Sequence, residues 1–132
     1  MNVRTSTRTL AVGLGLATTA AVLVGTPSSQ AMDRATTTVT IQAEGTDLSG
    51  TVLSKRRACK DERKVLLVKQ KGSKGGADDQ VISSDTTELE DGVGEWSTGN
   101  TGLEGRFYAK VKPTALCKGA VSPTVRAVRE ND

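Results

Sequence analysis

The clearest structural signal in this chain is the stretch Arg106-Phe107-Tyr108-Ala109-Lys110-Val111-Lys112. Phe107, Ala109 and Val111 occupy alternate positions in it, so their side chains share one face of an extended strand. Pro113 follows and ends the strand, because proline has no N–H to donate to a neighbouring strand. The stretch therefore predicts a β-strand with one face in a core.

Six further stretches carry short strand signals, and the segments between them carry turn signals rather than helical periodicity. The six stretches are 36–43, 48–52, 63–70, 80–84, 95–97 and 124–128. Seven short strands joined by polar, Gly-containing turns predict an all-β domain with the architecture of a β-sandwich.

The strand at 63–70 contains the apolar run Val65-Leu66-Leu67-Val68. If Val65 and Leu67 face the core, Leu66 and Val68 must face outward, because side chains alternate along a strand. Two interpretations follow for the outward pair. A loop or neighbouring strand covers it, or it forms a small apolar contact patch for a partner.

The first 31 residues resemble a secretory signal peptide. Arg4 and Arg8 give a positive start, an apolar stretch runs from Leu10 to Val24, and small residues lead to a plausible cleavage point at Ala31. A membrane-spanning helix needs about 20 apolar residues, more than this stretch offers. We therefore expect an exported protein whose only contact with a membrane precedes cleavage.

The expected organisation has three parts: a helical signal peptide over 1–31, a disordered mature N-terminus over 32–37, and one β-sandwich domain over 38–129. Loss of two arginines with the signal peptide lowers the formal net charge from +3 to +1. A nearly neutral mature protein gives no reason to expect nucleic acid as a partner. We expect the mature protein to be extracellular.

Charge is segregated along the chain. Residues 55–74 include nine of the basic side chains, whereas residues 78–104 include eight acidic ones and no Lys or Arg. These stretches either are solvated surfaces that neutralise one another or form a dipolar surface. In the second case the basic residues around Cys59 would bind an anionic cell-envelope polymer or an acidic protein. These residues are Lys55, Arg56, Arg57, Lys60 and Arg63.

Cys59 and Cys117 are the only cysteines of the chain. In an exported protein an even number of cysteines favours a disulfide, which here would stabilise the fold by about 4 kcal/mol in the chain-entropy model. A metal site and a catalytic thiol are the alternatives. The chain has no His, so the first lacks a common ligand and the second lacks its usual base.

The sequence contains no recognisable catalytic motif, and we expect neither an enzyme nor a bound cofactor or metal. Without His the usual hydroxyl-nucleophile triads are excluded. A Ca²⁺ site would have to use acids whose order does not match a twelve-residue calcium loop; these are Asp85, Glu88, Glu90 and Asp91. A sugar-binding platform would need exposed aromatic rings, and only Tyr108 is expected to face outward. A small secreted hydrolase with a carboxylate pair and a purely structural extracellular protein remain as alternatives.

Several short motifs together carry a family resemblance. They are Gly50-Thr51-Val52, Arg57-Ala58-Cys59, Arg63-Lys64-Val65-Leu66-Leu67, Gly94-Glu95-Trp96 and Gly105-Arg106-Phe107-Tyr108-Ala109-Lys110-Val111 before Cys117. In this order they resemble the small prealbumin-like (carboxypeptidase regulatory-like) domains of exported actinobacterial proteins, over roughly 38–128.

The resemblance implies a seven-stranded Greek-key sandwich of the immunoglobulin or prealbumin type. It also implies a disulfide between Cys59 and Cys117, and places Trp96 and Phe107 in the core. Members of the family serve mostly as accessory or interaction modules, so the resemblance implies no catalytic residues.

Overall fold

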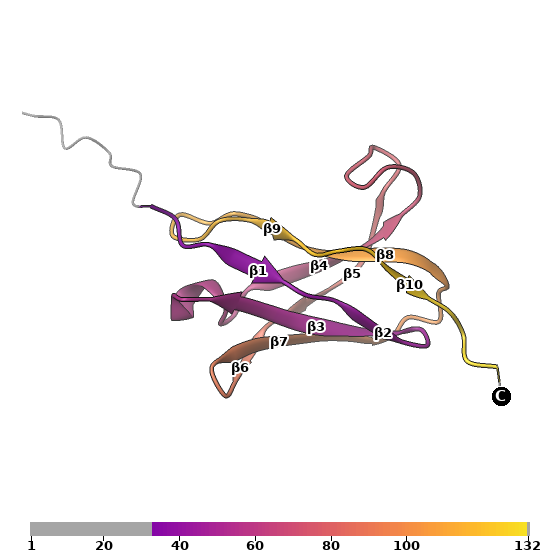
Figure 1. Cartoon of the computed structure of the whole chain (residues 1–132), viewed down its shortest axis with the longest axis horizontal. Coiled ribbons are helices and arrows are strands. Elements are labelled where there is room, and N and C mark those ends of the chain that lie inside the picture. The colour runs from indigo at the N-terminus through magenta and orange to yellow at the C-terminus, as the bar shows by residue number, and fades with distance from the viewer. Residues whose placement is uncertain (1–32, 132) are drawn as a thin grey trace, which may run out of the picture.

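Two antiparallel β-sheets pack face to face in the computed structural model, which describes residues 33–131 (Figure 1). The first sheet has the strand order β1-β3-β7-β6, and β2 pairs with β3 beside β1. Its strands are β1 (Thr37–Val39), β2 (Gln42–Glu44), β3 (Asp47–Ser54), β6 (Glu88–Glu90) and β7 (Val93–Asn100).

The second sheet has the strand order β10-β8-β4-β5, and β9 pairs with β8 beside β10. Its strands are β4 (Lys64–Gln70), β5 (Gln80–Thr86), β8 (Gly105–Val111), β9 (Ala120–Val121) and β10 (Val125–Ala127). A single turn of 3-10 helix, η1 (Arg57–Cys59), lies between β3 and β4. The predicted all-β sandwich is confirmed, and the predicted signal peptide lies outside the described residues.

The described chain has ten strands where the sequence predicted seven. The predicted strand at 36–43 is divided into β1 and β2 at Thr40, whose carbonyl accepts a hydrogen bond from the Trp96 indole (3.2 Å). The Thr40 hydroxyl takes over as acceptor for the Thr51 N–H (2.9 Å). Gly50 permits this arrangement, because a Cβ there would lie 2.0 Å from the Thr40 carbonyl oxygen.

The two other additional strands, β6 and β9, lie in segments for which the sequence predicted no strand. They have three and two residues, respectively. A strand this short contains too few positions to produce a recognisable alternation of apolar and polar residues. Strand β1 begins at Thr37, one residue before the predicted domain start at 38, and Ala35 forms an isolated bridge with Cys117.

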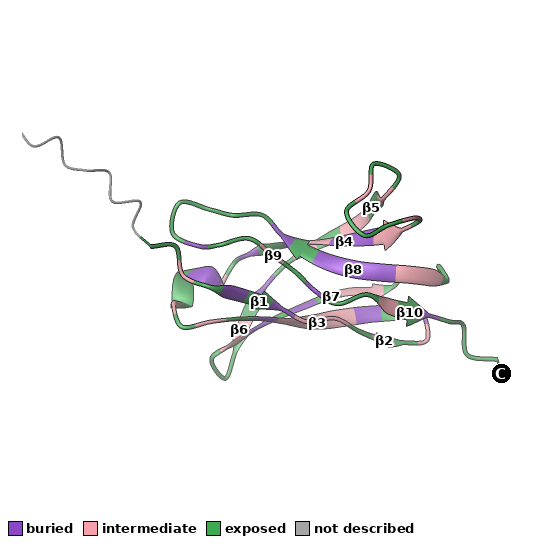
Figure 2. Ribbon diagram, turned by 45° about the horizontal axis from the view of Figure 1, so that its top comes forward, coloured by how far each residue is buried: buried purple, intermediate pink, exposed green. Residues whose placement is uncertain are grey.

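The core lies between the two sheets, and buried parts of β3, β4 and β8 are purple in Figure 2. Its buried members are Val39, Leu48, Val52, Val65, Leu67, Trp96, Phe107, Ala109, Val111 and Ala127. Trp96 and Phe107 are therefore buried, as the family resemblance implied. Among residues 33–131, no helix has the length and apolar character needed to cross a membrane.

Tyr108 corrects one expectation. Its strand position faces away from the core, but only 4% of the residue is exposed. The ammonium group of Lys74, from the loop between β4 and β5, lies 5.4 Å from the centre of the Tyr108 ring. The Tyr108 hydroxyl donates a hydrogen bond to Asp79 of the same loop (2.7 Å). The loop therefore covers an aromatic ring that the alternation pattern alone would leave in solvent.

The two sides of the sandwich differ. On one side the sheets meet, because β1 contacts β9 and β2 contacts β10. On the other side the edge strands are β5 and β6, which are consecutive in the chain but belong to different sheets, and β5 contacts β7 of the facing sheet. Thr87 is the residue between them, and its position determines the geometry of the candidate site.

Candidate functional site: the basic loop

The basic residues predicted to bind an anionic partner lie in or next to the connection between β3 and β4, residues 55–63, which we call the basic loop. A disulfide fixes this loop, since Cys59 is bonded to Cys117 in the connection between β8 and β9. The two Cα atoms are 5.4 Å apart and both residues are buried. The predicted disulfide is confirmed, and the metal and free-thiol alternatives for these cysteines are excluded.

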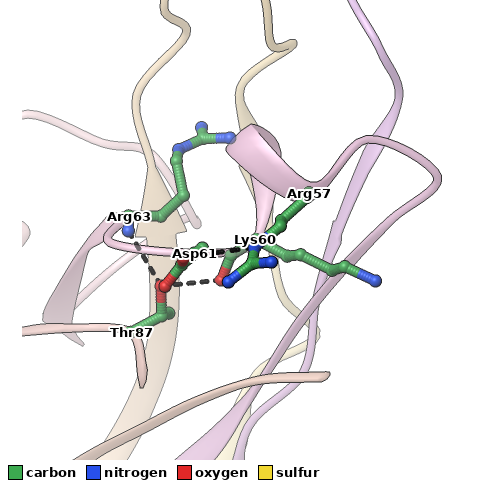
Figure 3. A network of polar contacts seen from close by, with 5 residues as sticks. All are labelled: Arg57, Lys60, Asp61, Arg63 and Thr87. Carbon is green, nitrogen blue, oxygen red and sulfur yellow. Dashed lines mark hydrogen bonds and ion pairs between the residues drawn. The ribbon is translucent and has the colours of Figure 1, made fainter. Parts of the chain in front are cut away.

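Thr87 is hydrogen-bonded to Lys60 and Arg63 of the basic loop (Figure 3). Its hydroxyl donates to the Lys60 carbonyl (2.8 Å) and accepts from the Arg63 N–H (2.8 Å). Its own N–H donates to the Arg63 carbonyl (2.8 Å), and its carbonyl accepts from the Glu62 N–H (3.1 Å). Because Thr87 is fully buried, these bonds are shielded from water and fix the backbone from Lys60 to Arg63.

The loop also lies directly against β7. A Cβ at Gly94 would lie 2.0 Å from the Lys60 carbonyl oxygen. Only glycine allows the two backbones to approach this closely at that point. The basic loop is thus bonded or packed against the β8–β9 connection, the β5–β6 crossing and strand β7.

Arg63 differs from the other four predicted anion-binding residues because it is buried, with 5% of the residue exposed. Its guanidinium donates to the carbonyls of Cys59 (2.9 Å) and Lys112 (2.9 Å) and to the Thr37 hydroxyl (3.4 Å). Burial lowers the pKa of the guanidinium below its usual value, because desolvation disfavours the charged form. The side chain connects the loop to both sheets, so the structure places Arg63 in the interior instead of on the binding surface.

The remaining four cations lie at the surface of the loop. Lys55 and Arg57 are exposed, whereas Arg56 and Lys60 are half-buried. Arg56 donates to the Leu116 carbonyl (3.3 Å) across the disulfide. Arg57 forms the one ion pair found among residues 33–131, at 3.7 Å from Asp61, and its side chain remains 78% exposed. Exposed pairs of this kind contribute little to stability, so most of the loop's positive charge is available to solvent.

The sequence analysis missed one exposed cation near the basic loop, Lys118. It follows Cys117, and its N–H donates to the Ala35 carbonyl (2.9 Å). The signal was present in the sequence, because a disulfide from Cys59 brings the residues next to Cys117 to the loop.

The two apolar residues predicted to face outward, Leu66 and Val68, differ in their burial. Val68 is buried, and it lies opposite Tyr108 in the pairing of β4 with β8. Leu66 is half-buried and lines an open cleft of about 320 Å³. The other lining residues are Glu62, Arg63, Lys64, Lys112, Pro113 and Thr114. The first interpretation, coverage by neighbouring structure, therefore applies to Val68, and a partner contact stays a prediction for Leu66.

The acidic stretch, residues 78–104, includes strand β5 and the hairpin of β6 and β7. Glu88 lies directly opposite Glu95, while Asp85 accepts a hydrogen bond from the Ser97 N–H (2.8 Å). Within the described part of the chain, no three His, Cys, Asp or Glu side chains are grouped as metal ligands. The hairpin lies beside the basic loop, since the Lys60 ammonium is 4.0 Å from the position of a Cβ at Gly92. The acidic and basic stretches are thus neighbours in space at this end of the sandwich.

Comparisons of the chain with protein-family models, with curated proteins and with solved structures found no match.

Proposed function

We propose that this chain is an exported, non-catalytic binding module whose basic loop binds an anionic partner. The contact residues are Lys55, Arg56, Arg57 and Lys60. The observation that carries the proposal is the combination of exposed cations with a fixed backbone. A preorganised loop loses little conformational entropy on binding, so more of the electrostatic attraction contributes to affinity.

Two features support the exported location within this proposal. The first 31 residues resemble a signal peptide, and the disulfide is compatible with an oxidising compartment. The prealbumin-like, Greek-key family assignment belongs to the proposal as well. It is supported by the antiparallel two-sheet topology, in which the described chain crosses between the sheets after β3, β5 and β7.

A charge-reversal series tests the proposed site. The loop variant combines Lys55→Glu, Arg57→Glu and Lys60→Glu; the matched control combines Lys71→Glu, Arg126→Glu and Arg129→Glu, which gives the same net charge away from the basic loop. Binding is measured by retention on immobilised polyphosphate and polyglutamate across a salt gradient. We expect the wild-type protein to be retained. The loop variant should bind at least about tenfold more weakly, because three charge contacts are lost.

The control decides what the result means. If the control variant binds as weakly as the loop variant, net charge alone governs retention and the basic loop is not a site. If the wild-type protein is retained by neither polymer at low salt, the electrostatic proposal is wrong. Circular dichroism and thermal unfolding of each variant establish that the fold is intact.

A further inference from the structure

The outer face of the β10-β8-β4-β5 sheet carries a group of apolar side chains that the proposed function does not use. The strand register places Val121 opposite Lys110, Lys110 opposite Leu66, and Leu66 opposite Ser84. The adjacent row across the sheet contains Tyr108, Val68 and Val81. Residues directly opposite on neighbouring strands share a face, so these side chains lie together.

The β4–β5 loop covers only part of this face. Tyr108 and Val68 are buried, whereas Val81 is 60% and Val121 49% exposed. Leu66 lies between the covered and uncovered parts, at the cleft of about 320 Å³. This volume is at the lower end of the range for ligand pockets and suffices for one large side chain with its backbone.

The charge around the cleft is predominantly positive. Lys64 and Lys112 line it, Lys110 lies next to Leu66 in the register, and all three are exposed. None of these lysines forms an ion pair within residues 33–131. Glu62 is the one carboxylate among the lining residues. An occupant that complements the cleft therefore has an apolar group for Leu66 and Pro113 and carboxylates for the lysines.

We propose that this cleft docks an acidic segment of a partner protein, with one apolar side chain inserted beside Leu66 and Pro113. Carboxylates on either side of that side chain lie against Lys64 and Lys112. A hydrophilic anionic polymer has no apolar group to occupy the cleft, and a flat lipid surface does not reach a concave floor. An acidic peptide segment satisfies both requirements. The site uses none of the four surface cations of the basic loop, so it stands independently of the proposed function.

The test uses the disulfide-bonded protein and two blocked peptides, Asp-Glu-Leu-Glu-Asp and Asp-Glu-Ser-Glu-Asp. Amide chemical shifts followed by NMR report both the affinity and the location of binding. We expect the Leu peptide to bind about tenfold more tightly than the Ser peptide, because the leucine side chain is removed from water. The shifts should occur at the amides of 64–66, 110–112 and 114.

Three variants complete the design. Leu66→Ser should remove the preference for the Leu peptide, and Lys64→Glu with Lys112→Glu should weaken both peptides. Lys71→Glu with Arg126→Glu, at exposed residues that do not line the cleft, should change neither affinity, which separates the site from an effect of net charge. Because Leu66 is half-buried, the double lysine variant keeps the test valid if Leu66→Ser is destabilised.

Several results would overturn the proposal. Equal affinity for the two peptides would show that only charge is recognised. Shifts confined to 55–60 would place the binding site in the basic loop. Absence of binding of either peptide at millimolar concentration would show that the cleft does not bind acidic peptides. Binding only to phosphatidylglycerol vesicles would show that the ligand is a lipid surface.

Discussion

Two charged loops of this protein are held in place in different ways. The basic loop, residues 55–63, is fixed by a disulfide, by the buried Arg63 guanidinium and by the buried Thr87 hydroxyl. The β4–β5 loop, residues 71–79, also carries two lysines but contains three glycines and two aspartates. No disulfide fixes it, and the Asp79 carboxylate and the Arg106 guanidinium bond its backbone. Loops that both carry lysines are thus held as a rigid element or as a tethered one, depending on which partners are buried.

Asp79 anchors its loop through three hydrogen bonds. One oxygen accepts from the Lys71 N–H (3.2 Å), and the other from the Gly75 N–H (2.8 Å) and the Tyr108 hydroxyl (2.7 Å). The bond from Tyr108 is the main cause that lowers the pKa of Asp79. Burial is the main cause that raises the pKa of Tyr108, and the bond to Asp79 adds to it. The anchor is therefore sensitive to pH, unlike the disulfide.

The largest effect is expected from removing the covalent anchor. Cys59→Ala with Cys117→Ala should lower the free energy of unfolding by about 4 kcal/mol, because the bond joins residues 58 apart and restricts the unfolded chain. Urea unfolding followed by the fluorescence of Trp96 measures the change. A loss under about 1 kcal/mol would show that the hydrogen bonds alone fix the basic loop, and the contrast between the two loops would disappear.

A smaller effect is expected at Thr87. Thr87→Val keeps the side-chain shape but removes the hydroxyl that bonds Lys60 and Arg63. We expect a loss of about 2 kcal/mol, because a partly buried carbonyl and a buried N–H lose their partner. Thr86→Val is the matched control, since Thr86 is exposed and should change stability by less than about 0.5 kcal/mol. Equal effects of the two substitutions would contradict the role given to Thr87.

The smallest effect on global stability is expected at Asp79, where the local effect is distinct. The chain has one tyrosine, so phenolate absorbance during an alkaline titration reports Tyr108 alone. Its midpoint should exceed the ordinary value of 10.0, and Asp79→Asn should lower it towards that value. Asp78→Asn, at the neighbouring exposed carboxylate, is the control.

The two pKa shifts set the pH window of the tether. The lowered pKa of Asp79 means that its contribution is present above the ordinary carboxyl pKa of 3.8 and is lost as pH falls through the lowered value. The raised pKa of Tyr108 means that its contribution is present below 10.0 and is lost as pH rises through the raised value. The amide resonance of Gly75 should follow the acidic transition. An unchanged Gly75 resonance would show that Asp79 does not anchor the loop.

The sequence predicted the two-sheet class and the disulfide because both depend on simple patterns. Alternation at 106–112 and an even number of cysteines are local and compositional features. The division of the first strand at Thr40 was not predictable, because it depends on the Trp96 indole, 56 residues away. The burial of Arg63 was missed for a similar reason: its partners are carbonyls and a hydroxyl brought together by the fold. Contacts with backbone oxygens carry no residue-type signal.

The different sides of the sandwich have a consequence for solubility at high concentration. Edge strands with free backbone groups are the places where folded β proteins join into larger aggregates. One side is closed by contacts between β1 and β9 and between β2 and β10, and on the other side Glu88 and Glu90 place like charges along β6. Residues 80–84 of β5 contain no charge, and Val81 is exposed there. Edge-to-edge aggregation of this protein would therefore start at β5. A single lysine placed on this strand would oppose it, because a charged side chain on an edge strand disfavours pairing with another chain.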